Sequence, residues 1–282
     1  MERGIELGDC EHVVIAGCGF SMTACGIHLT GCKHVTVKEC VISDIISSDG
    51  PLEGYGIVAE SGAYHRLANN RFKRMYKPCI HLSAGCSYSA VEGNVSEGSR
   101  DIMISLSSQL TPCTRNRISG NIVPGLGLAD GETSCIHGIR LKDYCTENVI
   151  EDNIISQASQ AGIVLLGEGT AGDDRPYGNV IRGNKIDGGP TGIWLRNTDG
   201  NVVSGNDVRR TGTGVLLDTF GEDDGAYCRQ NTVTQNTLFR CQAEGIRLDS
   251  SRRQGNAVFG NSGANNGEPV KNLGTDTVTG GF

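Results

Sequence analysis

The sequence predicts an all-β fold, a parallel β-helix that winds through about ten coils. Two short units alternate along nearly the whole chain, one apolar and one rich in Asn. The composition agrees, because 41 Gly and only one Trp in 282 residues favour many tight turns between short strands over long helices.

The apolar unit consists of a small residue, Ile or Val, any residue, and an aliphatic residue. Uninterrupted copies lie 22 to 24 residues apart, as from Ile5 to Ile27 and from Ile193 to Val215. Alternation at a period of two points both aliphatic side chains inward and the residue between them outward. Ten copies are present, at 4–7, 26–29, 56–59, 79–82, 101–104, 138–141, 162–165, 192–195, 214–217 and 245–248.

The polar unit, Asn-x-(Val/Ile)-x-x-Asn, lies between successive apolar units. Because Asn tolerates left-handed backbone, we expect it at the corners of each coil, where its side chains form hydrogen-bonded ladders between stacked coils. We expect the β-helix to span 1–262 and a polar tail, 263–282, to cover its last coil. The clearest copies are 116–121, 148–153, 179–184, 201–206, 231–236 and 256–261.

This pattern resembles the pectin-lyase-like right-handed parallel β-helix superfamily over roughly residues 4–262. The resemblance implies a right-handed coil and a carbohydrate-active protein. The string Asn197-Thr198-Asp199-Gly200 is similar to a polygalacturonase motif, but here it follows its strand, whereas in that family it precedes the strand. We therefore do not transfer the polygalacturonase mechanism, of which only His137-Gly138 has a counterpart.

Insertions into a solenoid usually mark its binding face. Two of the four insertions share the pattern Asp-Asp-x-x-Tyr and leave the repeat at the same register, one coil on either side of Trp194. Trp194 is either a sugar-stacking platform between two acidic loops or an aromatic ring that a loop covers. The loop residues are Asp173, Asp174 and Tyr177 in one insertion and Asp223, Asp224 and Tyr227 in the other.

The outward residues of the apolar units are predicted to form two columns. A basic patch in these columns, with Arg100 and His137 beside it, would suit an acidic sugar. The first column runs His81, Met103, Arg140, Val164, Trp194, Leu216, Arg247, and the second runs Ser83, Ser105, Lys142, Leu166, Arg196, Asp218, Asp249.

Three functions fit these residues, and glycoside hydrolysis of a polymeric, acidic glycan is slightly favoured. Its acid and base would come from Asp218 and the loop carboxylates, about 6.5–9.5 Å apart for inversion. In a lyase or epimerase, Lys142, Arg140, His137 or a Tyr would remove a proton beside a uronate carboxylate neutralised by Arg or calcium. No cofactor is expected to be required, and calcium is an option only for a lyase. The third function is a non-catalytic glycan-binding or spike-like module. The expected substrate-binding residues are Trp194, Arg140, Arg196, Tyr177, Tyr227 and Arg100.

Charge and cysteine usage exclude other classes. A net charge of −7 disfavours nucleic acid, and no apolar run is long enough to span a membrane. The 12 cysteines contain no CxxC pair, which disfavours a zinc ribbon. We expect a soluble protein without a signal peptide, secreted or virion-associated more than cytoplasmic. Its first coil would need a cap from another copy of the chain or from a missing N-terminal domain.

Overall fold

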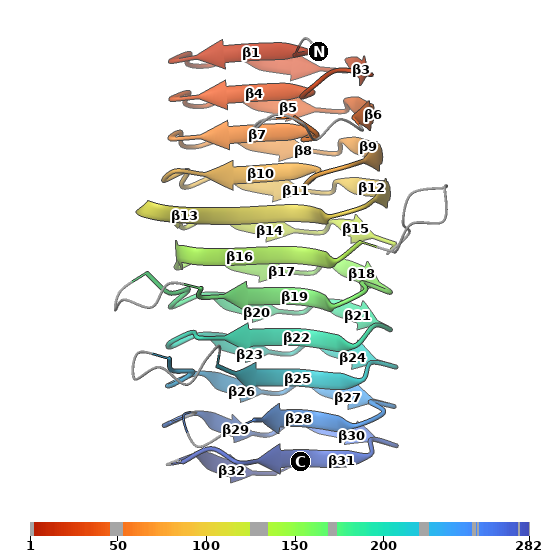
Figure 1. Cartoon of the computed structure of the whole chain (residues 1–282), viewed down its shortest axis with the longest axis vertical. Coiled ribbons are helices and arrows are strands. Elements are labelled where there is room, and N and C mark those ends of the chain that lie inside the picture. The colour runs from red at the N-terminus through yellow and green to blue at the C-terminus, as the bar shows by residue number, and fades with distance from the viewer. Residues whose placement is uncertain are drawn as a thin grey trace.

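The computed structural model describes residues 3–45, 53–124, 135–168, 174–219, 226–249, 252, 254–275 and 277–281. Their strands stack in a single column that forms a parallel β-helix, with the N-terminus at one end and the last strands at the other (Figure 1). In the stretches listed, no helix is long and apolar enough to cross a membrane.

Each of the first ten coils, or rungs, contributes one strand to each of three parallel sheets, named here sheets 1, 2 and 3, and within the described residues the last rung contributes strands to sheets 1 and 2 only. Sheet 1 holds β1 (Ile5–Gly8), β4 (Ile27–Thr30), β7 (Ile57–Glu60), β10 (Ile80–Ser83), β13 (Ile102–Thr114), β16 (His137–Thr146), β19 (Ala161–Leu166), β22 (Thr191–Arg196), β25 (Thr213–Asp218), β28 (Glu244–Leu248) and β31 (Glu268–Asn272).

The other two sheets follow the same order along the column. Sheet 2 holds β2 (Val14–Ala16), β5 (Thr36–Lys38), β8 (Arg66–Ala68), β11 (Ala90–Glu92), β14 (Arg117–Ser119), β17 (Val149–Glu151), β20 (Val180–Arg182), β23 (Val202–Ser204), β26 (Thr232–Thr234), β29 (Ala257–Phe259) and β32 (Val278–Gly280). Sheet 3 holds β3 (Gly19–Ser21), β6 (Val41–Ile45), β9 (Arg71–Met75), β12 (Val95–Ser99), β15 (Ile122–Val123), β18 (Ile154–Ser156), β21 (Lys185–Asp187), β24 (Asp207–Arg209), β27 (Thr237–Phe239) and β30 (Ser262–Ala264).

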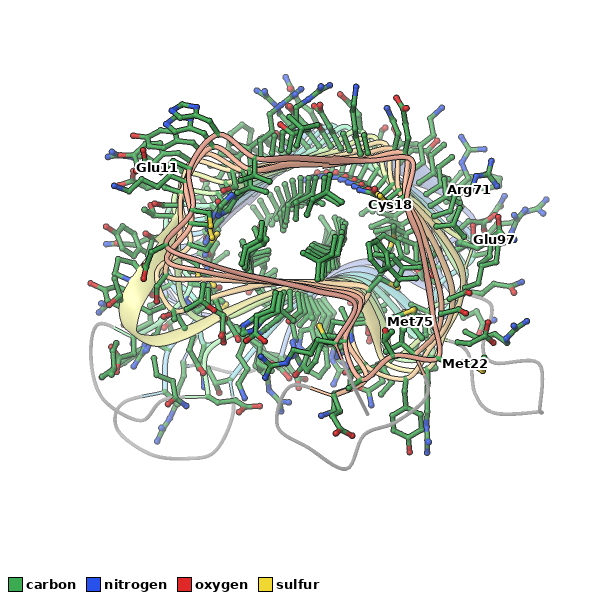
Figure 2. All side chains as sticks on the ribbon, turned by 90° about the horizontal axis from the view of Figure 1, so that it is seen from above. Glu11, Cys18, Met22, Arg71, Met75 and Glu97 are labelled. Atoms are coloured by element: carbon green, nitrogen blue, oxygen red, sulfur yellow. The ribbon has the colours of Figure 1, made fainter. Side chains whose placement is uncertain are left out.

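The core is a continuous aliphatic column enclosed by the three sheets, as the period-two pattern predicts. Figure 2, seen down the long axis, shows apolar side chains filling the interior, with Met75 among them, while Arg71 and Glu97 project outward. In sheet 1 the inward residues pair in register from rung to rung, for example Ile139 with Ile163 and Leu141 with Leu165. Burial of these side chains is the main favourable contribution to folding.

Two ladders of buried Asn run along the corners, which confirms the predicted role of the Asn unit. In each ladder the Asn Nδ2 donates to the Oδ1 of the Asn one rung further on, at 2.9–3.1 Å. The same Oδ1 accepts the backbone N–H of the preceding Asn, so the corner amides stay paired although they are buried. One ladder runs from Asn70 to Asn261 and the other from Asn116 to Asn256.

Two expectations from the sequence need correction, one about where the strands end and one about register. The strands continue past residue 262, because β31 and β32 pair with β28 and β29 and add an eleventh rung. Met103 does not face outward: it lies in the core, and Ser105 takes the outward place between His81 and Arg140. The run Ile102–Leu106 fits the repeat in two registers two residues apart, and the structure adopts the later one.

The cysteines serve packing. All 12 are described, and each is a free thiol, so the stacked positions of Cys10 and Cys32 hold no disulfide. Burial raises the pKa of the Cys25, Cys79 and Cys86 thiols to about 12. These three thiols stay protonated at neutral pH, which makes them poor nucleophiles, and they pack as small apolar side chains.

Candidate functional site

The outer face of sheet 1 carries the candidate site. Apart from the rung that holds Met103, its outward columns follow the predicted register, so Arg140 and Trp194 share one column and Lys142 and Asp218 share the next. The polar side chains of this face include two groups, one on rungs 3 to 6 and one on rungs 8 to 10, and His28 on rung 2 also pairs with Glu60 on rung 3 at 2.9 Å.

The first group is the His81 cluster, defined by Tyr55, His81, Asp101 and Arg140. Tyr55 precedes β7, His81 is the second residue of β10, Asp101 precedes β13, and Arg140 lies in β16. The Tyr55 ring packs on the His81 ring with centroids 5.4 Å apart and planes tilted by 33°. Arg140 donates from Nη2 to the Ser105 hydroxyl at 3.2 Å. Four consecutive rungs thus bring these side chains together.

Burial sets the protonation states in the His81 cluster. It lowers the pKa of His81 to about 4, and the nearby Arg140 guanidinium acts in the same direction. It also raises the pKa of Tyr55, to which the Asp101 carboxylate adds. Burial raises the pKa of Asp101 as well, against the opposing effect of Arg140 and Lys77. At neutral pH the cluster therefore presents a neutral imidazole and a protonated phenol beside a guanidinium.

The Nδ1 atom of His81 is buried and lacks a hydrogen-bond partner in the described parts of the chain, a property shared by Nδ1 of His137 and Nε2 of His65. A buried nitrogen without a partner costs stability.

A pocket of about 570 Å³ adjoins the cluster and includes His81 in its wall. One wall comes from β13, which extends beyond its neighbours and pairs irregularly with β16 between Ser108 and Cys113. Hydroxyl, amide and charged groups dominate the lining, and the volume suits a small ligand such as a few sugar rings. Its lining residues are Glu60, Ser61, His81, Ser83, Ala84, Ser107, Ser108, Gln109, Leu110, Thr111, Lys142 and Asp143.

Three of the predicted basic residues lie around this site. His137 is only 7% exposed, and burial together with Arg140 lowers its pKa to about 4. Lys142 lines the pocket and forms an ion pair with Glu168. Arg100 stacks its guanidinium over the Tyr76 ring at 4.4 Å. Of the two buried histidines near Arg140, His81 is thus the one in the pocket wall.

The second group is an ion-pair network of Arg196, Asp218, Glu244, Arg247 and Asp249. Asp218 accepts the Trp194 indole N–H at 3.0 Å and pairs with Arg196 at 3.3 Å. The Arg196 guanidinium also lies 4.8 Å from the centre of the Trp194 ring, so one face of the expected sugar platform is in contact with a protein cation. Further along, Arg247 donates to Asp249 at 2.9 Å and lies 3.6 Å from Glu244.

The acidic insertions are described only in part. Asp173, Asp223 and Asp224 lie outside the described residues, whereas Asp174 is half-buried. Tyr177 and Tyr227 are found at the corner between sheets 1 and 2. Within the described ranges, no group of three or more His, Cys, Asp or Glu side chains is arranged to hold a metal ion. The calcium site expected of a lyase stays a prediction.

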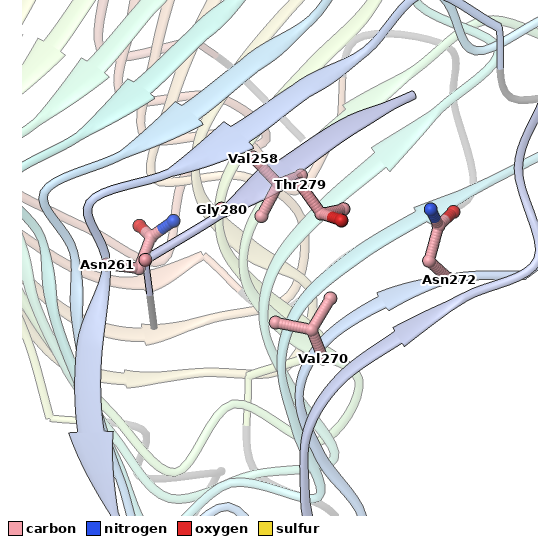
Figure 3. Close-up of a pocket in the computed structure, with 7 residues that line it drawn as sticks. Val258, Asn261, Val270, Asn272, Thr279 and Gly280 are labelled. Carbon is pink, nitrogen blue, oxygen red and sulfur yellow. The ribbon is translucent and has the colours of Figure 1, made fainter. Parts of the chain in front are cut away.

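A smaller hollow, of about 270 Å³, lies at the last rung (Figure 3). Val258, Val270, Asn261 and Asn272 face it, and no titratable side chain lines it. It therefore offers packing and amide contacts but no acid or base.

Sequence reasoning missed Tyr55, His81, Lys77 and Asp101 as site residues. The signals were present: His81 stands in the outward column that also holds Arg140, and Tyr55 directly precedes an apolar unit. Nothing in the repeat distinguishes these outward residues from solvated ones, because burial and missing partners depend on neighbouring rungs.

Several solved structures share the fold at low identity. The catalytic domain of a GH87 α-1,3-glucanase in complex with tetrasaccharides matches with a TM-score of 0.64 and 12% identity, over 98% of this chain and 62% of that one. An alginate lyase from Paenibacillus sp. str. FPU-7 matches with a TM-score of 0.64 and 14% identity, over 91% of this chain and 99% of that one.

A periplasmic alginate epimerase matches with a TM-score of 0.59 and 14% identity, over 90% of this chain and 61% of that one. This chain therefore spans less than two thirds of the glucanase and epimerase chains. At such identities the likeness is one of fold.

Curated proteins give no match to the sequence. A family model described as "Right handed beta helix region" matches residues 3–174 and 134–280, nearly the whole chain. With three parallel sheets, an aliphatic core and two Asn ladders already evident, the chain belongs to the family of right-handed β-helix proteins.

Proposed function

We propose that this protein binds an acidic glycan on the outer face of sheet 1 and removes the proton next to a uronate carboxylate, as a lyase or a C5-epimerase. The observation that carries the proposal is the His81 cluster, in which a neutral imidazole, a protonated phenol and a guanidinium converge beside a polar pocket. The solved alginate lyase and alginate epimerase of the same fold support this substrate class.

In this mechanism Arg140 pairs with the uronate carboxylate and stabilises the negative charge that develops on it. The His81 imidazole accepts the C5 proton while the electron pair of the broken C–H bond moves toward the carboxylate. Substrate charge beside His81 raises its pKa when the glycan binds, which strengthens the base at the moment of reaction.

The Tyr55 phenol then acts as the acid. In elimination its proton goes to the O4 leaving group as the C4–O4 bond breaks and the C4–C5 double bond forms. In epimerisation a proton returns to C5 from the opposite face, and no bond of the chain is broken. Both outcomes share the first proton transfer, and we propose that step for this site.

Hydrolysis has less support among the described residues. Of the carboxylates expected to act as acid and base, Asp218 is bound by Trp194 and Arg196, and Asp173, Asp223 and Asp224 lie outside the described ranges. Asp174 is described and half-buried, and it remains a candidate. The hydrolytic hypothesis stays a prediction from the sequence.

The test is to incubate the protein with polymannuronate, polygalacturonate and neutral polysaccharides in deuterated water. Ultraviolet absorbance of an unsaturated uronate indicates elimination, deuterium at C5 in an intact chain indicates epimerisation, and reducing ends alone indicate hydrolysis. We expect one of the first two, reduced about 10²–10⁴-fold by His81→Gln. The matched control is His34→Gln, which changes an exposed corner histidine. Full activity in His81→Gln would overturn the proposal.

A further inference from the structure

Two pairs of cysteines lie one above the other on the first two rungs. Cys10 on rung 1 stands over Cys32 on rung 2, and Cys18 stands over Cys40 at the next corner, where Figure 2 labels it. The residues on either side of each pair are partners between the two rungs, so both pairs are in register. A rung spacing of about 4.8 Å places the stacked Cα atoms within the range of about 4.4–6.8 Å that a disulfide spans.

The sulfur atoms of the rung-2 cysteines reach toward rung 1. The Cys32 Sγ accepts the backbone N–H of Cys10 at 3.4 Å and lies 3.4 Å from a rung-1 carbonyl oxygen. The Cys40 Sγ interacts with both the backbone and the thiol of Cys18, and it lies 3.9 Å from another rung-1 carbonyl oxygen. Each pair therefore has its second sulfur directed at the first without any change of register.

Cys18 and Cys40 occupy the place of a ladder asparagine. The Cys40 N–H donates to Oδ1 of Asn70 at 3.0 Å, and from Asn70 onward this corner holds an Asn on every rung from 3 to 10. A side-chain amide is a strong donor and acceptor, whereas a thiol is weak in both roles. The sulfur contact between rungs 1 and 2 is thus weaker than the amide contact that joins later rungs, and a covalent bond would strengthen the same corner.

Exposure distinguishes these two pairs from the other cysteines. Only Cys10 and Cys18 are partly exposed among the 12 thiols, and the other ten are buried. Thiol–disulfide exchange begins when an accessible thiolate attacks a disulfide. By contrast, Cys113 and Cys145 are also in register on adjacent strands, but both are fully buried. An external disulfide therefore reaches a paired thiol on rung 1 and does not reach the buried pair.

We propose that Cys10 with Cys32 and Cys18 with Cys40 are oxidation sites, at which a low-molecular-weight disulfide converts each thiol pair into a disulfide that fastens rung 1 to rung 2. The Cys18 thiol loses its proton to solvent, and the thiolate attacks one sulfur of the small disulfide and releases one small thiolate. The Cys40 thiolate, formed in the same way, then attacks the Cys18 sulfur and releases the second small thiolate.

The exchange is balanced without any other reactant. Two protein thiols are oxidised to one disulfide, and the small disulfide is reduced to two thiols that take up the two protons. Cys10 and Cys32 react by the same two steps. Both sites lie on rungs 1 and 2, apart from the His81 cluster, and do not depend on the proposed reaction.

The test treats the native protein with glutathione disulfide, alkylates the remaining thiols in denaturant and maps the peptides by mass spectrometry. We expect the bridges Cys10–Cys32 and Cys18–Cys40, with the other eight thiols alkylated. Hydrogen exchange of the amides in β1, β2 and β3 should slow by about 10²-fold on oxidation and recover on reduction, because the bridges constrain the locally opened chain.

Serine variants assign each bridge. Cys18→Ser should abolish only the bridge to Cys40, and Cys10→Ser should abolish only the bridge to Cys32. Both replace partly exposed side chains, so we expect the variants to fold. The matched control is Cys113→Ser, which alters the buried in-register pair and should leave both bridges in place.

Four outcomes would overturn the proposal. They are alkylation of all 12 thiols after treatment, mixed disulfides with glutathione that persist on Cys10 or Cys18, a Cys113–Cys145 bridge that forms as fast as the other two, and bridges that leave hydrogen exchange on rung 1 unchanged. Selective formation of the two bridges, with slower exchange on rung 1, supports it. Activity on polyuronates bears on neither result.

Discussion

Arg140 and Arg247 occupy the same outward column of sheet 1, four rungs apart, yet their surroundings differ. Arg140 lies among a neutral histidine, a serine hydroxyl and a half-buried phenol, and the adjoining pocket is open to a ligand. Arg247 is held by Asp249 and Glu244 within the ion-pair network. In the proposed function, one repeat position therefore serves ligand recognition on rung 6 and structural stability on rung 10, and the residues of adjacent rungs determine which.

The largest difference is expected from exchanging each arginine for glutamine. Arg140→Gln should lower kcat/KM on the uronate polymer by about 10²-fold or more, because a carboxylate loses its charged partner. Arg247→Gln should leave kcat/KM within about twofold, since its charge is already neutralised by protein carboxylates. Steady-state kinetics of the two variants measure this. Equal losses of kcat/KM in the two variants would mean that rungs 8 to 10 also contact the substrate.

The second prediction concerns stability in acid, which should be lost first on rungs 3 to 6. Burial lowers the pKa of His65, His81 and His137 from 6.5 to about 4. Between these values the unfolded chain binds protons that the folded chain does not, so the free energy of unfolding falls as pH falls. The full slope is about 1.4 kcal/mol per pH unit for each histidine, and it ends near pH 4.

Urea unfolding from pH 7 to pH 4.5 measures how the free energy of unfolding changes with pH. Hydrogen exchange shows which rungs open first. His65→Asn is the control, because Asn occupies the equivalent place at Asn116 in the corner ladder, and it should remove about a third of the slope. A stability that does not change over this range would contradict the predicted neutral state of these rings.

The third prediction tests the structural role of the ion-pair network. Asp218→Ala should lower the free energy of unfolding by about 2 kcal/mol, because the Arg196 guanidinium and the Trp194 N–H lose their acceptor. Chemical denaturation measures the loss. Activity on polyuronates should persist, whereas its abolition with stability intact would restore Asp218 as a catalytic carboxylate and favour hydrolysis.

The smallest effect is expected from Trp194→Phe. The substitution removes the indole N–H that Asp218 accepts but keeps an aromatic ring beside Arg196, so we expect a loss of about 1 kcal/mol and unchanged polymer affinity. Thermal unfolding and calorimetric titration measure the two quantities. A tenfold loss of affinity would show that Trp194 is a sugar platform after all.

The fold was accessible from sequence because its rules are local and repeated. The period of two fixes which residues face inward, and the Asn units mark the corners, so nearly every strand of sheet 1 lies where the repeat predicts. The failures occur where the local signal is degenerate or weak. Ile102–Leu106 fits two registers, and the eleventh rung has only Val270 in place of the apolar pair.

The candidate site was harder to predict from the sequence, because its properties depend on contacts between residues of different rungs. Arg140 was identified by its charge, but His81 and Tyr55 become notable only through burial and mutual contact across rungs. Conversely, Trp194 and Asp218 drew attention as residue types, and the structure shows them bound to each other. A repeat pattern predicts whether a side chain points inward or outward, but it does not predict which residues that side chain contacts.

The Asn ladders repeat the same contacts from rung to rung between Asn70 and Asn261, so they carry no information about how many coils the molecule has. Duplicating one coil between His81 and Arg140 would preserve the corner hydrogen bonds and the core, yet it would move the two side chains apart by about 4.8 Å. Under the proposed function, the stability of this architecture tolerates changes in coil number, whereas the proposed activity depends on that number. A change in coil number within such a scaffold would therefore leave folding stability nearly unchanged but would abolish the proposed reaction.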